Sequence, residues 1–102
     1  MPILHTVNKS PFEKSSLDTC LRIASQGSSV LLIEDGVYAA MNGTSLNGAL
    51  SDASKRLRFY ALGPDLSARG LSEKDVMDFV QIVDYDGFVD LVVEHDVTHA
   101  CL

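Results

Sequence analysis

The stretch Val30-Leu31-Leu32-Ile33, followed directly by Glu34-Asp35-Gly36, is the clearest indication of the fold class. Its first four residues are all apolar and include two β-branched side chains, which favours a strand. A strand that is apolar at every position is typical of the interior of a parallel sheet, where helices cover both faces. We therefore expect residues 30–33 to form an inner strand of an α/β protein, ended by an acidic turn.

Similar apolar runs, rich in β-branched or aromatic residues, occur on either side of this strand. They predict further strands at residues 3–7, 57–62, 81–83 and 97–102. The segments between the first four strands are long enough for helices, and this alternation favours βαβ units. The sequence thus predicts a three-layer α/β sandwich, flavodoxin-like or Rossmann-like, with a mainly parallel sheet of four to five strands in a single domain spanning residues 1–102.

Capping residues and helical spacing predict the helices between these strands. The first should begin at Ser15 or Ser16, whose hydroxyl can cap free backbone amides, and end at Gly27, which tolerates a left-handed conformation. Another should begin after Ser72, because charged residues suited to a first turn follow it. The remaining two are expected at residues 44–54 and 87–94.

Charge and composition exclude several classes of partner. Hydrophobic residues make up 46% of the 102 residues, as in globular proteins, and the formal net charge is −6. Nucleic-acid binding requires clustered basic side chains, whereas the only tight basic group, at Lys55, Arg56 and Arg58, fits a solvated helix-to-strand junction. We expect no direct contact with nucleic acid.

The start of the chain and its cysteines bear on location. Residues 1–9 lack the pattern of a signal peptide, and no apolar run approaches the ~20 residues that span a bilayer, so we expect a cytoplasmic protein without a membrane segment. Cys20 and Cys101 lie far apart in the sequence, and a reducing compartment disfavours a disulfide between them. They are interpreted as two independent thiols.

Familiar cofactor and metal motifs are missing from the sequence. There is neither a dinucleotide-binding glycine triplet nor a phosphate loop, so no cofactor is predicted. His95, Asp96 and His99 superficially suggest a metal-binding helix, but the Val-Thr pair before His99 favours a strand. In a strand His99 and Cys101 would share a face, which gives two ligands and not a closed site of four, so no metal is predicted.

Acidic pairs and one cysteine are the remaining candidates for chemistry. Glu34 with Asp35, or Asp84 with Asp86, would follow strands where active sites of this architecture form, although helix capping or solvation explains them more simply. Cys20 falls within the apolar stripe of the first expected helix. It is either a packed core cysteine or, if accessible with a lowered thiol pKa, a reactive one.

Segments along nearly the whole chain together resemble one family. They are Leu4-His5-Thr6 with Lys9-Ser10-Pro11-Phe12, Leu31-Leu32-Ile33-Glu34-Asp35-Gly36-Val37, Tyr60-Ala61-Leu62 with Asp65-Leu66-Ser67-Ala68-Arg69-Gly70-Leu71, and Asp84-Tyr85 with Phe88-Val89. In order and spacing they resemble the DsrH/TusB family. This match is far more specific than any single motif in the chain.

The resemblance implies a sulfur-relay subunit. Such complexes are heterohexamers with two copies each of DsrE/TusD-type, DsrF/TusC-type and DsrH/TusB-type chains. They pass persulfide sulfur to an acceptor of the DsrC/TusE type, and the main persulfide cysteine belongs to the DsrE/TusD-type partner. Cys20 resembles a cysteine of DsrH-like members from sulfur-oxidising organisms, which suggests an auxiliary persulfide site and the sulfur-oxidation branch.

Three alternatives remain beside that interpretation. The chain could be a docking subunit without chemistry of its own, or it could serve the branch that thiolates tRNA to 2-thiouridine. A free-standing flavodoxin-like cofactor domain rests only on analogy of fold, which is a weak argument for function.

Overall fold

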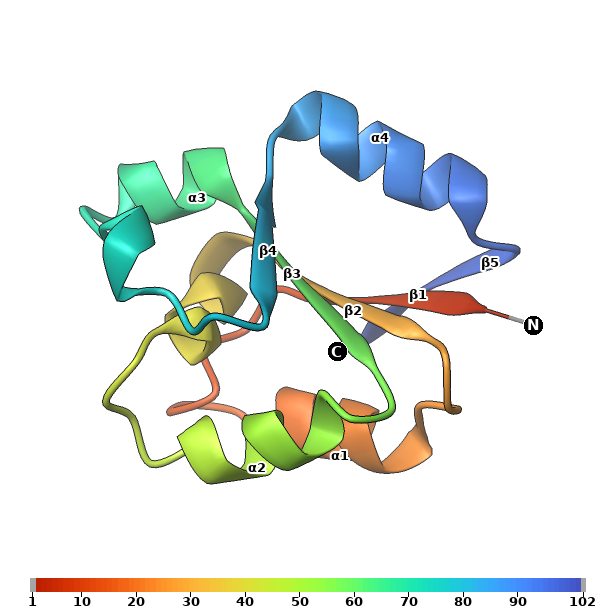
Figure 1. The fold of residues 1–102 in the computed structure, drawn as a ribbon, viewed down its shortest axis with the longest axis horizontal. Helices are drawn as coiled ribbons and strands as arrows, with labels where there is room; N and C mark the ends of the chain where they lie inside the picture. The colour runs from red at the N-terminus through yellow and green to blue at the C-terminus, as the bar shows by residue number, and fades with distance from the viewer. Residues whose placement is uncertain (1, 102) are drawn as a thin grey trace.

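Five parallel strands form one sheet in the order β4-β3-β2-β1-β5 (Figure 1). The computed structural model describes residues 2–101. The strands are β1 (Ile3–Val7), β2 (Ser29–Leu32), β3 (Arg58–Leu62), β4 (Val80–Val83) and β5 (Val97–Cys101). Each lies within two residues of a predicted strand, and the parallel α/β architecture is confirmed. The last residue of the fifth predicted strand, Leu102, lies outside the described residues.

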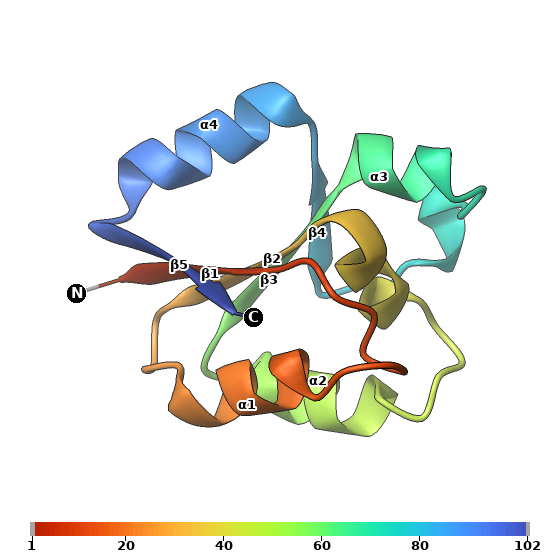
Figure 2. The same cartoon turned by 180° about the vertical axis from the view of Figure 1, so that it is seen from behind.

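Helices cover both faces of this sheet. Helices α1 (Ser16–Ile23) and α2 (Asn47–Ala53) lie on one side, and α3 (Gly63–Ala68) and α4 (Tyr85–Glu94) lie on the other (Figures 1 and 2). Two 3-10 segments, η1 (Glu34–Ala40) and η2 (Glu73–Asp75), complete the elements. Within residues 2–101, none of these helices has both the length and the apolar character needed to cross a bilayer.

Strand β2 has the two-sided burial that its sequence predicts. All four of its residues are buried. Val30 and Leu32 pack into the large core shared with α1 and α2, whereas Leu31 packs with Leu4 and Leu91 beneath α4. Each buried leucine or valine contributes roughly 1.5–3 kcal/mol relative to an exposed one, so this strand anchors both layers.

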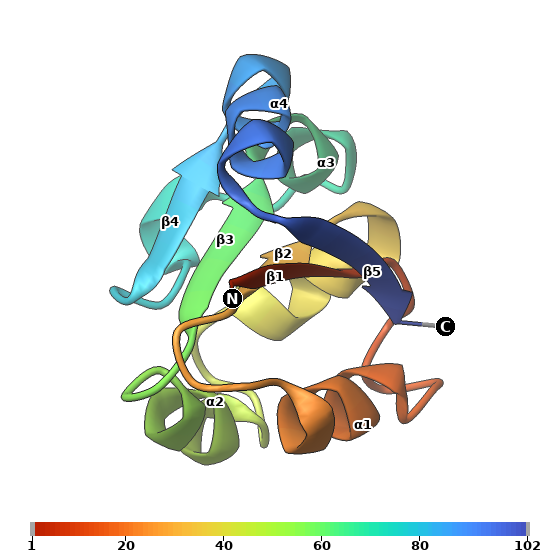
Figure 3. The same cartoon turned by 90° about the vertical axis from the view of Figure 1, so that its right-hand side faces the viewer.

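The first and last strands of the described chain lie side by side. Strand β5 pairs in parallel with β1, which places His5 beside His99 and Val7 beside Cys101 (Figure 3). Helix α4 makes this possible because it carries the chain from β4 at one edge of the sheet to β5 at the other. Residues separated by almost the whole sequence therefore become neighbours.

Two helix predictions need correction. The first helix ends at Ile23 rather than at Gly27, although Gly27 does adopt a positive φ of 87° in the turn that follows. The helix predicted after Ser72 is wrong, because that segment makes only the short η2. Its continuation is prevented by pairing with another loop: Met41 bridges Val76, and the Met77 N–H donates to the Ala40 carbonyl. Tertiary contacts here outweigh local capping.

Helix α3 was missed at the sequence level. It begins directly after β3 at Gly63-Pro64, with proline in its first turn. Proline is favoured at this position because its missing N–H and fixed φ suit the first turn of a helix. The buried Leu66 then fixes α3 against the core, so a helix of six residues persists.

The basic group at the start of β3 has a structural role. Arg56 donates from Nη1 to the carbonyl of Ala24 at 2.8 Å, and from Nη2 to the carbonyl of Leu21. These carbonyls lie at the end of α1, where backbone acceptors lack helical partners and a cation is favoured. The group lies between α2 and β3, at the predicted helix-to-strand junction, and its Arg56 side chain caps the end of α1.

Candidate functional site

The turn after β2 is held close to the end of β1. The Ile33 N–H donates to the Val7 carbonyl at 3.0 Å, and the Gly36 N–H donates to the Ile33 carbonyl at 2.8 Å. A Cβ atom at Gly36 would lie only 2.1 Å from the Val7 carbonyl oxygen, so this position requires glycine for steric reasons. Glu34, between them, adopts a positive φ of 49°, which is uncommon for a residue with a side chain.

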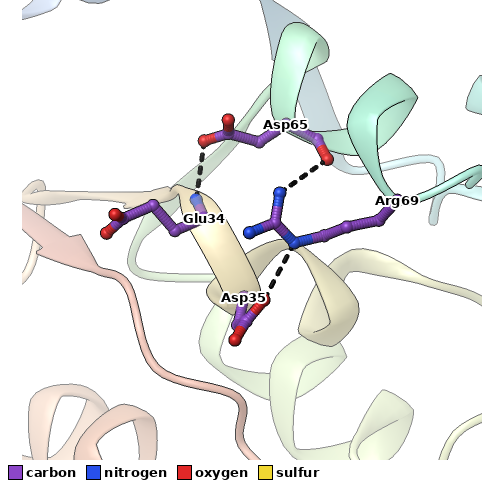
Figure 4. Close-up of polar contacts among 4 residues, drawn as sticks. All are labelled: Glu34, Asp35, Asp65 and Arg69. Atoms are coloured by element: carbon purple, nitrogen blue, oxygen red, sulfur yellow. Dashed lines mark hydrogen bonds and ion pairs between the residues drawn. The ribbon is translucent and has the colours of Figure 1, made fainter.

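Four polar residues join this turn to α3 and to the residue that follows it (Figure 4). The Glu34 N–H donates to Asp65 Oδ2 at 2.6 Å. Arg69 donates from Nε to Asp35 Oδ1 at 2.9 Å and from Nη1 to the Asp65 carbonyl at 3.1 Å. The four residues therefore form a polar clasp between the carboxyl ends of β2 and β3, and we call this group the clasp.

The electrostatics of the clasp favour a structural role. The hydrogen bond to Asp35 is the main cause that raises the pKa of Arg69 above its usual value, so its guanidinium stays charged. The oxygen atoms of Asp35 and Asp65 are used by Arg69 and by the Glu34 backbone. These contacts place neither a histidine nor a nucleophile beside Glu34 and Asp35, so they add no support to an acid-base role for this pair. Reasoning from residue types alone missed Arg69, whose only sequence signal was its place in a family segment.

The second acidic pair behaves as a helix cap. Asp84 Oδ1 accepts a hydrogen bond from the Gly87 N–H at 2.8 Å, which is the contact expected of an N-cap residue of α4. Asp86 lies in the first turn of that helix, where a negative charge is favoured by the helix dipole. The capping alternative therefore accounts for the positions of both residues.

The cysteines form a disulfide, and the prediction of two independent thiols is wrong. Cys20 and Cys101 are bonded, with Cα atoms 6.1 Å apart. Separation along the chain was misleading, because β5 lies beside β1 and directly under α1. Both side chains are buried, with Cys20 only 1% exposed, as the packed-core alternative for Cys20 requires. In this state Cys20 offers no thiolate for sulfur transfer.

Two histidines border the disulfide. The Nδ1 atoms of His5 and His99 lie 3.2 Å apart, and Cys101 Sγ lies 4.0 Å from the first and 3.9 Å from the second. Burial is the main cause that lowers the pKa of His5, and the nearby His99 lowers it further. His5 therefore favours the neutral form. Sequence reasoning singled out His99 but not His5, because the pairing of β1 with β5 was not predictable.

His95 does not join this cluster. Its ring nitrogens contact the Leu91 carbonyl at 2.6 Å and the Ser29 hydroxyl at 2.8 Å. Ser29 is paired in register with Leu4, which packs under α4, whereas His5 and His99 lie on the other face. The histidines of the superficial metal motif thus lie on opposite faces of the sheet, and β5 is a strand as its sequence predicted.

Comparisons with solved structures agree with this architecture. The ychN protein from E. coli superposes with a TM-score of 0.80 over 98% of both chains, at 16% identity. A protein of unknown function from Methanobacterium thermoautotrophicum, MTH1491, superposes with a TM-score of 0.75 over 96% of both chains, at 19% identity. At these identities the likeness concerns the fold alone.

Sequence comparisons reach further. Residues 9–98 match the family model described as DsrH like protein. Protein TusB from Pectobacterium atrosepticum is 42% identical over 93 residues, which cover 91% of this chain and 94% of the relative. Protein TusB from Escherichia coli K12 is 39% identical with the same coverage. The chain therefore belongs to the DsrH/TusB family.

Proposed function

We propose that this chain is a subunit of a sulfur-relay complex in which persulfide sulfur passes to an acceptor of the DsrC/TusE type. Membership of the DsrH/TusB family supports the proposal. The partners would be DsrE/TusD-type and DsrF/TusC-type chains, in a heterohexamer with two copies of each. Within it, this chain shapes the assembly and helps to dock the acceptor.

The state of Cys20 is the observation that carries this division of labour. Sulfur transfer requires an accessible thiolate, whereas Cys20 is 1% exposed and bonded to Cys101. This state supports the proposal that the principal persulfide cysteine belongs to the DsrE/TusD-type partner. Rapid labelling of Cys20 by a thiol reagent in the native assembly without a reductant would contradict this assignment, because the bonded sulfur cannot react until the disulfide is reduced.

An exposed apolar surface on α4 suits contact with a related subunit. Exposed apolar side chains recur along α4 at helical spacing, and the most exposed of them, Val93, is 78% exposed. Contiguous apolar surface of this kind is typical of protein contacts. We define this α4 surface by Tyr85, Val89, Val92 and Val93.

A matched pair of substitutions tests the assembly role. Val89 on α4 and Ile23 on α1 are β-branched and almost equally exposed, at 60% and 59%, on opposite faces of the sheet. After coexpression with the two partner types, Val89→Asp should lose hexamer in native mass spectrometry, and Ile23→Asp should keep it. An intact hexamer with Val89→Asp would reject the α4 surface. Failure of the unmodified chain to join the partners would reject the relay proposal itself.

Cys20 as an auxiliary persulfide site is the more specific form of the proposal. A dithiol would first reduce the disulfide to two thiols. The Cys20 thiolate would then attack the outer sulfur of a donor persulfide, forming a Cys20 persulfide and releasing the donor thiolate. Mass spectrometry of the reduced, donor-loaded complex tests this step. Sulfur loading of this chain that is unchanged by Cys20→Ser would remove it.

A gene deletion can show which of the two pathways this chain serves. The presence of Cys20 supports the sulfur-oxidation branch, whereas relatives named TusB support the branch that thiolates tRNA. Deleting the gene and measuring both 2-thiouridine in tRNA and growth on reduced sulfur separates the two. Loss of 2-thiouridine with normal sulfur oxidation would assign the chain to the tRNA branch, and the opposite result would assign it to sulfur oxidation.

A further inference from the structure

Four metal-binding side chains converge between the β1–β5 pair and α1. His5 and His99 are register partners on adjacent strands, and Cys101 follows His99 by two residues on the same face. Cys20 approaches from α1, and its sulfur lies within 4.8 Å of the ligand atoms that His5 and Cys101 offer. Two thiols and two imidazoles are a frequent ligand set for zinc.

The spacing of three of these atoms already fits a tetrahedral ion. With typical zinc bond lengths, two nitrogen ligands lie about 3.3 Å apart, and a nitrogen and a sulfur lie about 3.6 Å apart. The two Nδ1 atoms are 3.2 Å apart. Cys101 Sγ lies 4.0 Å from Nδ1 of His5 and 3.9 Å from Nδ1 of His99. Shifts of a few tenths of an ångström would bring all three onto one ion.

The disulfide holds the fourth ligand out of place. Two thiolates on one zinc ion lie about 3.8 Å apart, much farther than bonded sulfurs. Cys20 and Cys101 can therefore bind a metal ion only after their bond is broken. The oxidised and metal-bound states exclude each other, since the same two sulfur atoms serve both.

The surroundings suit a bound ion. His5 is 4% exposed, and Cys20 and Cys101 are 1% and 6% exposed, so three ligands are shielded from water. His99 is exposed and gives an ion access from solvent. The Nε2 atom of His5 is buried without a hydrogen-bond partner, which costs about 1–3 kcal/mol. Ligation through Nδ1 would leave this cost in place, since Nε2 is not the ligand atom, so the spacing of the ligand atoms and their burial are what support a bound ion.

We propose that reduction of the Cys20–Cys101 disulfide creates a Zn²⁺ site formed by His5, Cys20, His99 and Cys101. A dithiol supplies two electrons and two protons to the sulfur atoms and itself becomes a disulfide. Zinc then binds the two thiolates through sulfur, and two protons leave to solvent. The ion joins β1, α1 and β5, as the disulfide joins α1 and β5. The site does not rest on the relay proposal, although Zn²⁺ bound to Cys20 would exclude a persulfide at that sulfur atom.

Cobalt substitution in the full-length chain tests the site. The protein is reduced with a phosphine, freed of metal with a chelator, and titrated with Co²⁺ under anaerobic conditions. One equivalent should give the visible bands of tetrahedral cobalt and a thiolate charge-transfer band, and Zn²⁺ should remove both. The oxidised chain should give neither. Absence of these bands in the reduced chain, or equal Zn²⁺ binding in both states, would overturn the proposal.

Substitutions identify the ligands. His99→Gln changes an exposed ligand with little risk to folding and should weaken Zn²⁺ binding by at least about tenfold. Cys20→Ser should abolish the charge-transfer contribution of one thiolate. His95→Gln is the matched control, because this histidine lies near His99 in sequence but on the other face, and its titration should equal that of the parent. Parent-like affinity in His99→Gln would reject the site even if Cys20→Ser failed to fold.

Discussion

Arg69 and Asp35 are joined by a hydrogen-bonded ion pair of 2.9 Å between two segments that are far apart in sequence. The Arg69 side chain is 22% exposed, and the same guanidinium also binds the Asp65 carbonyl. The pair between Arg22 and Asp18 is a useful contrast, because it spans one helical turn at 3.5 Å with both side chains 71% exposed. The two pairs have the same chemistry in different surroundings.

Double-mutant cycles should therefore separate these pairs. Replacing Arg69 and Asp35 by alanine, singly and together, should reveal a coupling of about 1–2 kcal/mol in urea unfolding, since a charged hydrogen bond is partly shielded there. The Arg22–Asp18 cycle should give less than about 0.5 kcal/mol. Arg69→Lys should lose much of the coupling, because lysine lacks the planar fork. Equal coupling in the two cycles would show that the Arg69–Asp35 pair stabilises the turn no more than an exposed ion pair stabilises a helix.

Replacing glycine by alanine at two positions should change the stability of the protein in opposite directions. A Cβ at Gly36 would meet the Val7 carbonyl oxygen at 2.1 Å, and both partners are backbone, so neither can move cheaply. Gly36→Ala should lower the free energy of unfolding by about 3 kcal/mol or more, or prevent folding. Gly48, within α2, has nothing within 4 Å of its Cβ position.

Gly48→Ala should accordingly stabilise the protein by about 0.4–1 kcal/mol, because alanine restricts the unfolded chain and favours a helix. Thermal unfolding followed by circular dichroism measures both variants. If the two substitutions changed the melting temperature in the same direction, the close approach at Gly36 would not be the cause of its effect.

Strand positions were predictable because their signal is local. The run at 30–33 is apolar at every position, and the structure buries β2 on both faces. Helix α3 was not predicted, because six residues are too few to show a repeating apolar spacing. The helix expected after Ser72 fails because Val76 and Met77 pair with the loop after η1, a contact that no local pattern encodes.

The candidate sites were less predictable for the same reason. Sequence placed His99 and Cys101 on one strand face but could not show that β1 pairs with β5 and brings His5 beside them. Nor could it show that α1 carries Cys20 to Cys101. These groups meet only because α4 crosses the sheet from edge to edge, and the order of strands is a property of the whole chain.

The disulfide should stabilise the metal-free protein strongly. It joins residues separated by 81 positions, and closing a loop of that size should stabilise by up to about 4.5 kcal/mol through restriction of the unfolded chain. A phosphine reductant with a chelator present should lower the urea midpoint of the parent. The double variant Cys20→Ser, Cys101→Ser should not respond to the reductant. An unchanged parent midpoint would mean that the bond contributes nothing to stability.

Acid should destabilise the oxidised, metal-free protein through His5. The groups facing its ring are His99 and Cys101 on β5 and Cys20 on α1, and the cysteines do not titrate while bonded. Burial lowers the folded-state pKa of His5 below the unfolded value of 6.5, so the unfolded chain binds more protons as pH falls through 6.5. Stability from this residue is present above that pH and is lost below it, by at most about 1.4 kcal/mol per pH unit.

The measurement is urea unfolding at a series of pH values from 7.5 downwards, in about 0.15 M salt. His5→Leu removes the titrating ring, and its stability should fall less steeply below pH 6.5 than that of the parent. His95→Gln should keep the parent slope, because it removes a histidine from the other face. A His5→Leu slope as steep as the parent slope would show that His5 gains protons equally in both states, contrary to its burial beside His99.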